Sequence, residues 1–242
     1  MIEVEAINAI AETWGRNYQP LRVRLILQAN SWMVNYHPLQ LDGLLARAAV
    51  ERATEGRGLP DAEDGYWLPL PLKQLWQSAE GYPLWAASAF YPVGPSVEDI
   101  YVRHKRNSEG AMHSHKKLTT RNGPWMERRL PTPVRVCTTY EARAIGNLES
   151  IVELLKDFVY VGKLRLARVV KIEVEATEYG DAEIVMDGMT LIKTIPAEAQ
   201  LLKLWPAAPT LVGWTPPHWK PSLFRLGWPA GTRNPVDWFT AM

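Results

Sequence analysis

The stretch that decides the fold is residues 21–27, which read LRVRLIL. Apolar and basic residues alternate at first and the end is continuously apolar, a pattern that predicts a β-strand. Upstream, Ile7, Ile10 and Trp14 recur at spacings of three and four, which predicts a short amphipathic helix that docks on the body of the protein. Pro20 separates this helix from the strand.

Downstream of this strand, helices and strands are predicted in alternation. The predicted elements are a helix at 39–53 with Asp42 near its positive end, a loop at 54–65, short strands within the proline-rich stretch 66–92, a strand at 134–140, a helix at 148–158 with Asn147 as N-cap, a strand at 169–177 and one or two more strands within 182–195. The order of strands and helices is that of the α+β ferredoxin-like plan, in which an antiparallel sheet packs against two helices. The RNA-recognition motif (RRM) shares this plan.

The composition of the 242 residues excludes several classes of protein. With 47% hydrophobic and 22% charged residues the chain is globular rather than disordered. Cys137 is the only cysteine, which excludes an intrachain disulfide framework and a Cys-rich zinc site. No apolar run approaches the roughly 20 residues that cross a bilayer, and the start MIEVE is acidic, unlike a signal peptide. These features predict a cytoplasmic protein.

The net charge of +1 conceals an uneven distribution. Residues 101–135 contain nine Lys and Arg but two Glu, so this segment carries +7 and the rest of the chain −6. Three of the five histidines also fall in it. A segment this basic on an acidic body predicts a polyanion site, built as a long loop or a hairpin that projects from the body. The alternative is a solvated loop without a specific ligand.

The C-terminal segment is rich in Trp and Pro. Between Trp205 and Trp238 it contains five Trp and seven Pro. We expect these side chains to pack the segment on the body or on a partner, because large aromatic rings supply most of the burial energy of irregular segments. Stacking on nucleobases is the alternative.

Motifs for common enzyme chemistry are absent from the sequence. It contains no P-loop, no Gly-x-Gly-x-x-Gly stretch and no Gly-x-Ser-x-Gly elbow. His113 and His115 could supply two metal ligands, but no matching Cys or carboxylate set is visible, so we predict neither a metal nor another cofactor. A histidine among Lys and Arg could also act as a general base in metal-free RNA cleavage.

Four stretches together resemble one family. They are YHPLQLDGLLA at 36–46, PLWAAS at 83–88, the span 143–165 from RAIGN to YVGKLR, and GWTPPHW at 213–219. In order and spacing they resemble the subunit of type IV CRISPR effector complexes that corresponds to the 5′-handle-capping subunit of type I systems, a member of the RAMP (repeat-associated mysterious protein) superfamily. The resemblance covers roughly residues 21–232.

This resemblance implies a RAMP ferredoxin-like domain and a non-catalytic role. The implied organisation is a helical extension at 1–19, the RAMP domain at 20–204 with a basic thumb-like insertion at about 101–130, and an irregular Trp/Pro-rich tail at 205–242. The implied partners are the 5′ handle of the CRISPR RNA (crRNA), the repeated backbone subunit, a large-subunit-like protein and, in the assembled complex, target DNA.

The expected RNA-binding residues are cations and histidines of the insertion and of the Gly-Lys-x-Arg stretch. They are Lys105, Arg106, His113, His115, Lys116, Lys117, Arg121, Arg128, Arg129, Lys163, Arg165 and Arg168. Family members continue from this stretch into a glycine-rich turn, whereas this chain reads LARVV at 166–170. Because glycine permits close approach of the backbone to RNA, Arg165 and Arg168 are expected to contact phosphate through their side chains instead, unless they are solvated or paired with acids.

The sequence is also compatible with two other classes of function. One is a metal-independent CRISPR RNA-processing endoribonuclease of the same superfamily, with His113 or His115 as base. The other is a protein scaffold whose Trp/Pro-rich tail is the docking surface.

Overall fold

A computed structural model of the chain describes residues 2–29, 31–34, 38–55, 67–105, 128–162, 166–202, 207–216, 218 and 221–233. The elements up to residue 105 are α1 (Ile2–Glu12), β1 (Gln19–Leu27), β2 (Trp32–Val34), α2 (Leu41–Ala53), β3 (Gln74–Gln77), β4 (Pro83–Trp85), β5 (Tyr91–Pro92) and β6 (Val97–Lys105). Those from residue 128 are β7 (Arg128–Val136), β8 (Thr139–Gly146), α4 (Leu148–Leu155), β9 (Tyr160–Val161), β10 (Ala167–Ala176), α5 (Asp181–Val185), β11 (Met186–Asp187), β12 (Thr190–Leu191), β13 (Ile195–Pro196), η2 (Ala197–Ala199), β14 (Thr210–Gly213), η3 (Pro221–Leu223) and β15 (Phe224–Trp228).

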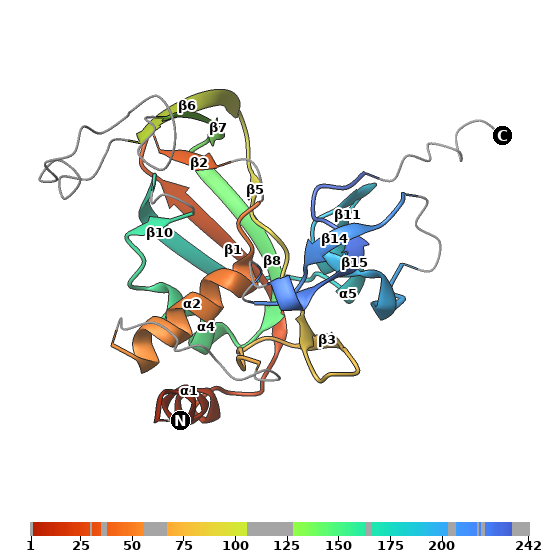
Figure 1. Cartoon of the computed structure of the whole chain (residues 1–242). Helices are drawn as coiled ribbons and strands as arrows, with labels where there is room; N and C mark the ends of the chain where they lie inside the picture. Colours follow the sequence, from red (N-terminus) through yellow and green to blue (C-terminus); the bar gives the residue numbers. More distant parts are fainter. Residues whose placement is uncertain are drawn as a thin grey trace, which may run out of the picture.

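The body of the protein is an antiparallel sheet with the order β5-β8-β1-β10-β9, packed against helices (Figure 1). β1 lies in the centre and pairs with β8 on one side and β10 on the other. In the chain, α2 connects β1 to β5 and α4 connects β8 to β10, which gives the sequence of elements and the antiparallel pairing of a ferredoxin-like plan. The fold is therefore mixed α and β, and it is compatible with the predicted class.

Strand β1 has one face in the core and one face outside it. Leu21, Val23 and Leu25 are fully buried, whereas Arg22 and Arg24 between them are partly exposed. The buried face packs against α2 and α4, whose apolar residues belong to the same cluster. The opposite side of the sheet, which we call the open face, therefore presents the arginines of the predicted LRVRLIL strand.

The N-terminal helix and the N-cap follow the prediction. Ile7 of α1 is fully buried in the main core, so α1 docks on the body of its own chain. The side chain of Asn147 accepts a hydrogen bond from the backbone N–H of Ser150 at 2.9 Å, which caps α4. α4 ends at Leu155, three residues before the predicted end.

The prediction of a single strand at 134–140 is wrong. The structure divides this stretch into the end of β7 and the beginning of β8, with Cys137 and Thr138 between them. β7 pairs with β6 and β2, whereas β8 enters the main sheet beside β1. β-Branched side chains suit both strands, so local composition could not locate the break between two different sheets.

The C-terminal part forms a second, smaller lobe beside the sheet (Figure 1). Residues 182–195, expected to hold one or two strands, contain most of α5, the two very short strands β11 and β12 and the first residue of β13. The tail expected to be irregular contributes β14 and β15, which form a sheet in the order β13-β15-β14. Leu84, Val212 and Trp214 lie in the core of this lobe, so Trp214 packs inside the protein as predicted.

Candidate nucleic-acid interface

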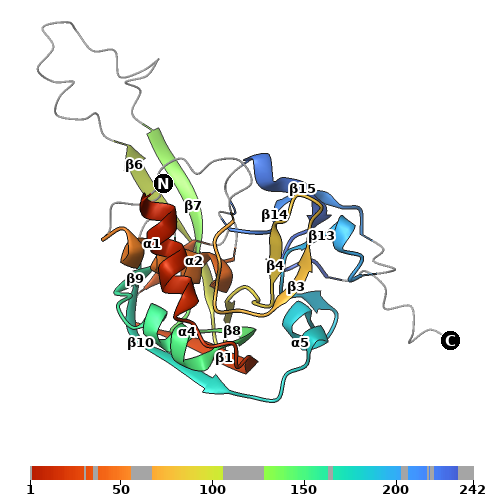
Figure 2. The same ribbon diagram turned by 90° about the horizontal axis from the view of Figure 1, so that it is seen from below.

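The basic insertion leaves the body as a two-stranded hairpin. β6 and β7 pair in continuous antiparallel register from Val97 opposite Val136 to Lys105 opposite Arg128. The hairpin lies between β5 and β8 in the chain and projects away from the helices and the main sheet (Figure 2). We call this hairpin the arm. Its base is anchored by Val134, which is 1% exposed, whereas Ile100 farther along is 62% exposed.

The register of the arm places basic residues opposite basic residues. His104 pairs with Arg129, and Lys105 pairs with Arg128. Lys105 and Arg128 are both cationic, and like charges at directly opposed positions of an antiparallel ladder are unfavourable. A polyanion that neutralises such a pair makes the placement favourable.

Only part of the predicted RNA-binding set falls in the described residues. Lys105, Arg128 and Arg129 are placed as residues of the arm strands, and Arg168 lies at the start of β10. The other predicted residues lie outside the described residues: Arg106, His113, His115, Lys116, Lys117, Arg121, Lys163 and Arg165.

A second element of the interface lies at the edge of the main sheet, where β9 pairs with β10. Tyr160 is directly opposite Arg168, and Val161 is directly opposite Ala167. Val161 and Ala167 are fully buried, so Tyr160 and Arg168 lie on the other side, on the open face. Tyr160 is 42% exposed. The pair offers an aromatic ring and a guanidinium group, the combination that single-stranded nucleic acid uses for stacking and phosphate contact.

The backbone at Arg168 is fixed by Ser31. The buried hydroxyl of Ser31 accepts from the N–H of Arg168 at 3.1 Å and donates to its carbonyl at 3.4 Å. The N–H of Gln28 donates to the same carbonyl at 2.9 Å, and the side-chain oxygen of Gln28 accepts from the guanidinium group at 3.4 Å. No acid is among these contacts, so the charge of Arg168 is not neutralised by them. Nothing in the composition singles out Tyr160. Its position opposite Arg168 in the register is what identifies it as a candidate binding residue.

A buried charge cluster, which the sequence did not predict, joins the two lobes. Asp42 of α2 is fully buried and accepts from Lys193 Nζ at 3.2 Å and from His218 Nε2 at 2.9 Å. Lys193 also donates to the carbonyl of Ala87 at 2.8 Å, and His218 Nδ1 lies 3.0 Å from the carbonyl of Gly213. Both ring nitrogens of His218 therefore lie within hydrogen-bond distance of an acceptor oxygen.

The charge state of Asp42 follows from these contacts. Burial raises its pKa, but the charges of Lys193 and His218 and their hydrogen bonds outweigh burial and hold the pKa at about 2. Asp42 is therefore ionised near neutral pH. Both nitrogens of His218 are already engaged, so the cluster is an inter-lobe contact rather than a general base ready to accept a proton.

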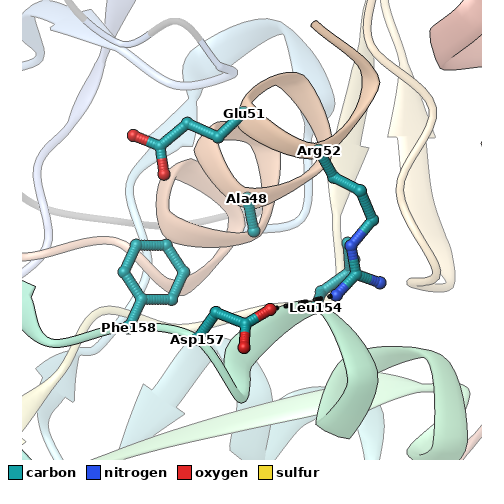
Figure 3. A pocket seen from close by; sticks show the side chains of 6 residues that line it. All are labelled: Ala48, Glu51, Arg52, Leu154, Asp157 and Phe158. Atoms are coloured by element: carbon teal, nitrogen blue, oxygen red, sulfur yellow. Dashed lines mark ion pairs between the residues drawn. The ribbon is translucent and has the colours of Figure 1, made fainter. Parts of the chain in front are cut away.

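A pocket between α2 and the C-terminal end of α4 offers no comparable chemistry. It has a volume of about 260 Å³ (Figure 3). Its lining residues are Ala48, Glu51, Arg52, Leu154, Asp157 and Phe158. The charged groups are engaged within the protein: Arg52 lies 3.5 Å from Asp157, and Glu51 lies 2.7 Å from Arg47.

In the described parts of the chain, no group of three or more His, Cys, Asp or Glu residues is placed to hold a metal ion. In the same residues no helix combines the length and the apolar character needed to cross a membrane.

Comparison with protein families and with curated proteins finds no match for this chain.

Proposed function

We propose that this chain is a non-catalytic RNA-binding subunit of a type IV CRISPR effector ribonucleoprotein. In this role it binds the 5′ handle of the crRNA and caps the filament of repeated backbone subunits. It contacts a large-subunit-like protein, takes part in the recognition of target DNA in the assembled complex, and works in the cytoplasm.

The observation that carries the proposal is the register of the arm. A hairpin that opposes the two cations Lys105 and Arg128 is less stable alone than around a phosphodiester chain. The segment between these strands adds Arg106, Lys116, Lys117 and Arg121, so the whole insertion is strongly cationic. RNA suits this charge because phosphate contacts dominate the affinity of nucleic-acid binding.

The edge pair Tyr160 and Arg168 gives independent support. It lies on the open face of a sheet in the plan that RNA-recognition motifs share, and those motifs stack bases on aromatic side chains of the sheet. Arg168 follows Lys163 and Arg165 closely in the chain, just after one of the stretches that carry the family resemblance. In this proposal the arm supplies most of the phosphate contacts and the edge holds one base.

The experiment that tests the proposal measures handle-RNA binding as a function of salt. The variant Lys105→Gln/Arg128→Gln/Arg129→Gln removes three charges from the arm. A matched control, Arg47→Gln/Lys73→Gln/Lys156→Gln, removes three charges outside the arm, each of which pairs with an acid. We expect the arm variant to reduce the slope of log K against log salt by about 2, because each phosphate contact on a single strand contributes about 0.7.

The control variant should bind RNA as the unchanged protein does. Equal affinity and slope for the arm variant and the unchanged protein would refute the RNA-binding role of the arm. Cleavage of repeat RNA in EDTA, lost when His113 or His115 is replaced by Ala, would contradict the non-catalytic role and favour the endoribonuclease.

A further inference from the structure

The open face carries a regular lattice of charges. In the register of the three central strands, Arg22 lies between Arg143 and Glu175, and Arg24 lies between Glu141 and Glu173. The side chains at these positions alternate with the buried residues of β1 and β8 and so share the open face. Ile26, opposite Lys171, continues the next row.

Each cation of the lattice has a carboxylate partner. Arg22 contacts Glu175 at 2.5 Å, Arg24 contacts Glu141 at 3.0 Å, Lys171 contacts Glu173 at 2.7 Å, and Arg143 contacts Asp187 at 3.1 Å. The four cations and four acids cancel, so the open face is electrically neutral around β1. The hydrogen bond with Glu175 also raises the pKa of Arg22.

Glu141 and Glu175 hold the centre of the lattice. Glu175 contacts both Arg22 and Arg24, the latter at 3.6 Å, and Glu141 also reaches both, with Arg22 at 4.0 Å. Without these two acids, Arg22 would lose both carboxylates that it contacts, and Arg24 would keep only Glu173, which lies opposite it in the register. Arginine is the residue that recognises phosphate most readily, so such a surface would attract an RNA backbone without regard to sequence.

The ion pairs of this lattice contribute little to the folding stability of the protein. Its side chains are partly exposed: 30% for Arg22, 31% for Arg24 and 46% for Glu175. Ion pairs at such exposure are screened by water and salt and contribute little to folding. Their effect on the electrostatic potential of the face is larger, because a partner of opposite charge removes the attraction for a polyanion.

We propose that Glu141 and Glu175 determine specificity by keeping RNA off the open face around β1. Their carboxylates occupy the guanidinium groups that would otherwise hold phosphates, and so confine RNA to the arm and to the edge formed by Tyr160 and Arg168. This inference rests on the RNA-binding function proposed above.

The test compares two variants with the same change in net charge. Glu141→Gln/Glu175→Gln removes the two central acids with little change of shape. The control, Glu149→Gln/Glu153→Gln, removes two exposed acids from α4, which packs on the opposite side of the sheet. Binding of a single-stranded RNA of random sequence is measured for both at 50 and 200 mM salt.

The lattice variant should gain two phosphate contacts, so its slope of log K against log salt should steepen by about 1.4. Its affinity for random RNA should then fall about sevenfold more than that of the unchanged protein between the two salt concentrations. Ultraviolet crosslinking should place the additional contacts on β1 and β8. The α4 variant should show neither change.

The arm variant described above, measured on the same RNA, separates the two proposals. If the arm variant loses affinity while the lattice variant behaves like the α4 control, the role of Glu141 and Glu175 is refuted and the function stands. If the arm variant keeps full affinity, the proposed function itself fails. A gain by both glutamate variants alike would also overturn the inference, because net charge alone would then explain it.

Discussion

Removing the charge of Asp42 should destabilise the protein far more than any change to an exposed ion pair. In Asp42→Asn the side chain keeps its size but loses the charge that Lys193 and His218 share. Lys193 is 1% exposed and would retain the Ala87 carbonyl as its partner, so its ammonium group would be buried without a counter-charge beside it. Leaving a buried ion in this state costs about 3–5 kcal/mol.

A second substitution measures how much of this cost belongs to the pair. Lys193→Met removes the ammonium group and keeps an unbranched apolar chain, and the double variant Asp42→Asn/Lys193→Met leaves neither charge. We expect each single substitution to lower the free energy of unfolding by about 3–5 kcal/mol. The double variant should lose about 2 kcal/mol less than the sum of the two single losses.

Urea unfolding followed by tryptophan fluorescence supplies the free energies, since Trp214 is buried in the smaller lobe. The matched control is Lys73→Met, which breaks the exposed contact of Lys73 with Asp181 at 2.7 Å and should cost at most about 1 kcal/mol. Two results would contradict this account of the buried cluster. One is that Asp42→Asn lowers the free energy of unfolding no more than Lys73→Met does. The other is that the losses of Asp42→Asn and Lys193→Met are simply additive in the double variant.

Three other outcomes are expected. Because the pKa of Asp42 is held at about 2, the stability that it contributes is present above pH 4 and is lost as the pH falls from 4 towards 2; a pH series of urea unfolding should show about 2.5 kcal/mol of acid-dependent loss that is missing in Asp42→Asn. Tyr160→Ala should weaken handle-RNA binding by about 1–3 kcal/mol in a filter-binding titration, whereas Tyr160→Phe keeps the ring and should bind normally; equal affinity of the two variants would argue against stacking. Asn147→Ala should lower the free energy of unfolding by about 1 kcal/mol through the lost cap of α4, and an unchanged urea midpoint would contradict this.

The main elements of the sheet body could be predicted from local pattern. The alternation in residues 21–27 identified the central strand, and Asn147 identified the beginning of α4, because both signals arise within a few residues of chain. The break at Cys137 and Thr138 could not be predicted, since it depends on which sheet each half joins. The strands β14 and β15 of the smaller lobe were missed for a similar reason: they pair with each other and β15 pairs with β13, which no local pattern in the Trp/Pro-rich tail records.

The residues of the candidate site and of the buried cluster divide in the same way. Charge counting found the insertion, and its hairpin form was one of the two forms expected. The contact of Asp42 with Lys193 and His218 joins positions far apart in the sequence, and no local pattern records it. The sequence does show one hint, which is that Asp42 is an acid on a helix face otherwise made of Leu and Ala. Its position was explained by the positive end of the helix alone. The oxygen of Asp42 does accept from the N–H of Gly43 at 2.8 Å, so that explanation was incomplete rather than wrong.

Because β1 lies in the centre of the sheet, its pairing is completed only late in the synthesis of the chain. The ribosome makes this strand early, but Leu27 finds its partner Val169 only after about 140 further residues have been added. At roughly 5–20 residues per second this side of the strand waits on the order of ten seconds for β10, with its backbone groups unpaired. Pairings this distant also fold slowly, because a long loop must close before they form. Yield in cells should therefore depend on chaperones that shield the N-terminal strand until β10 emerges.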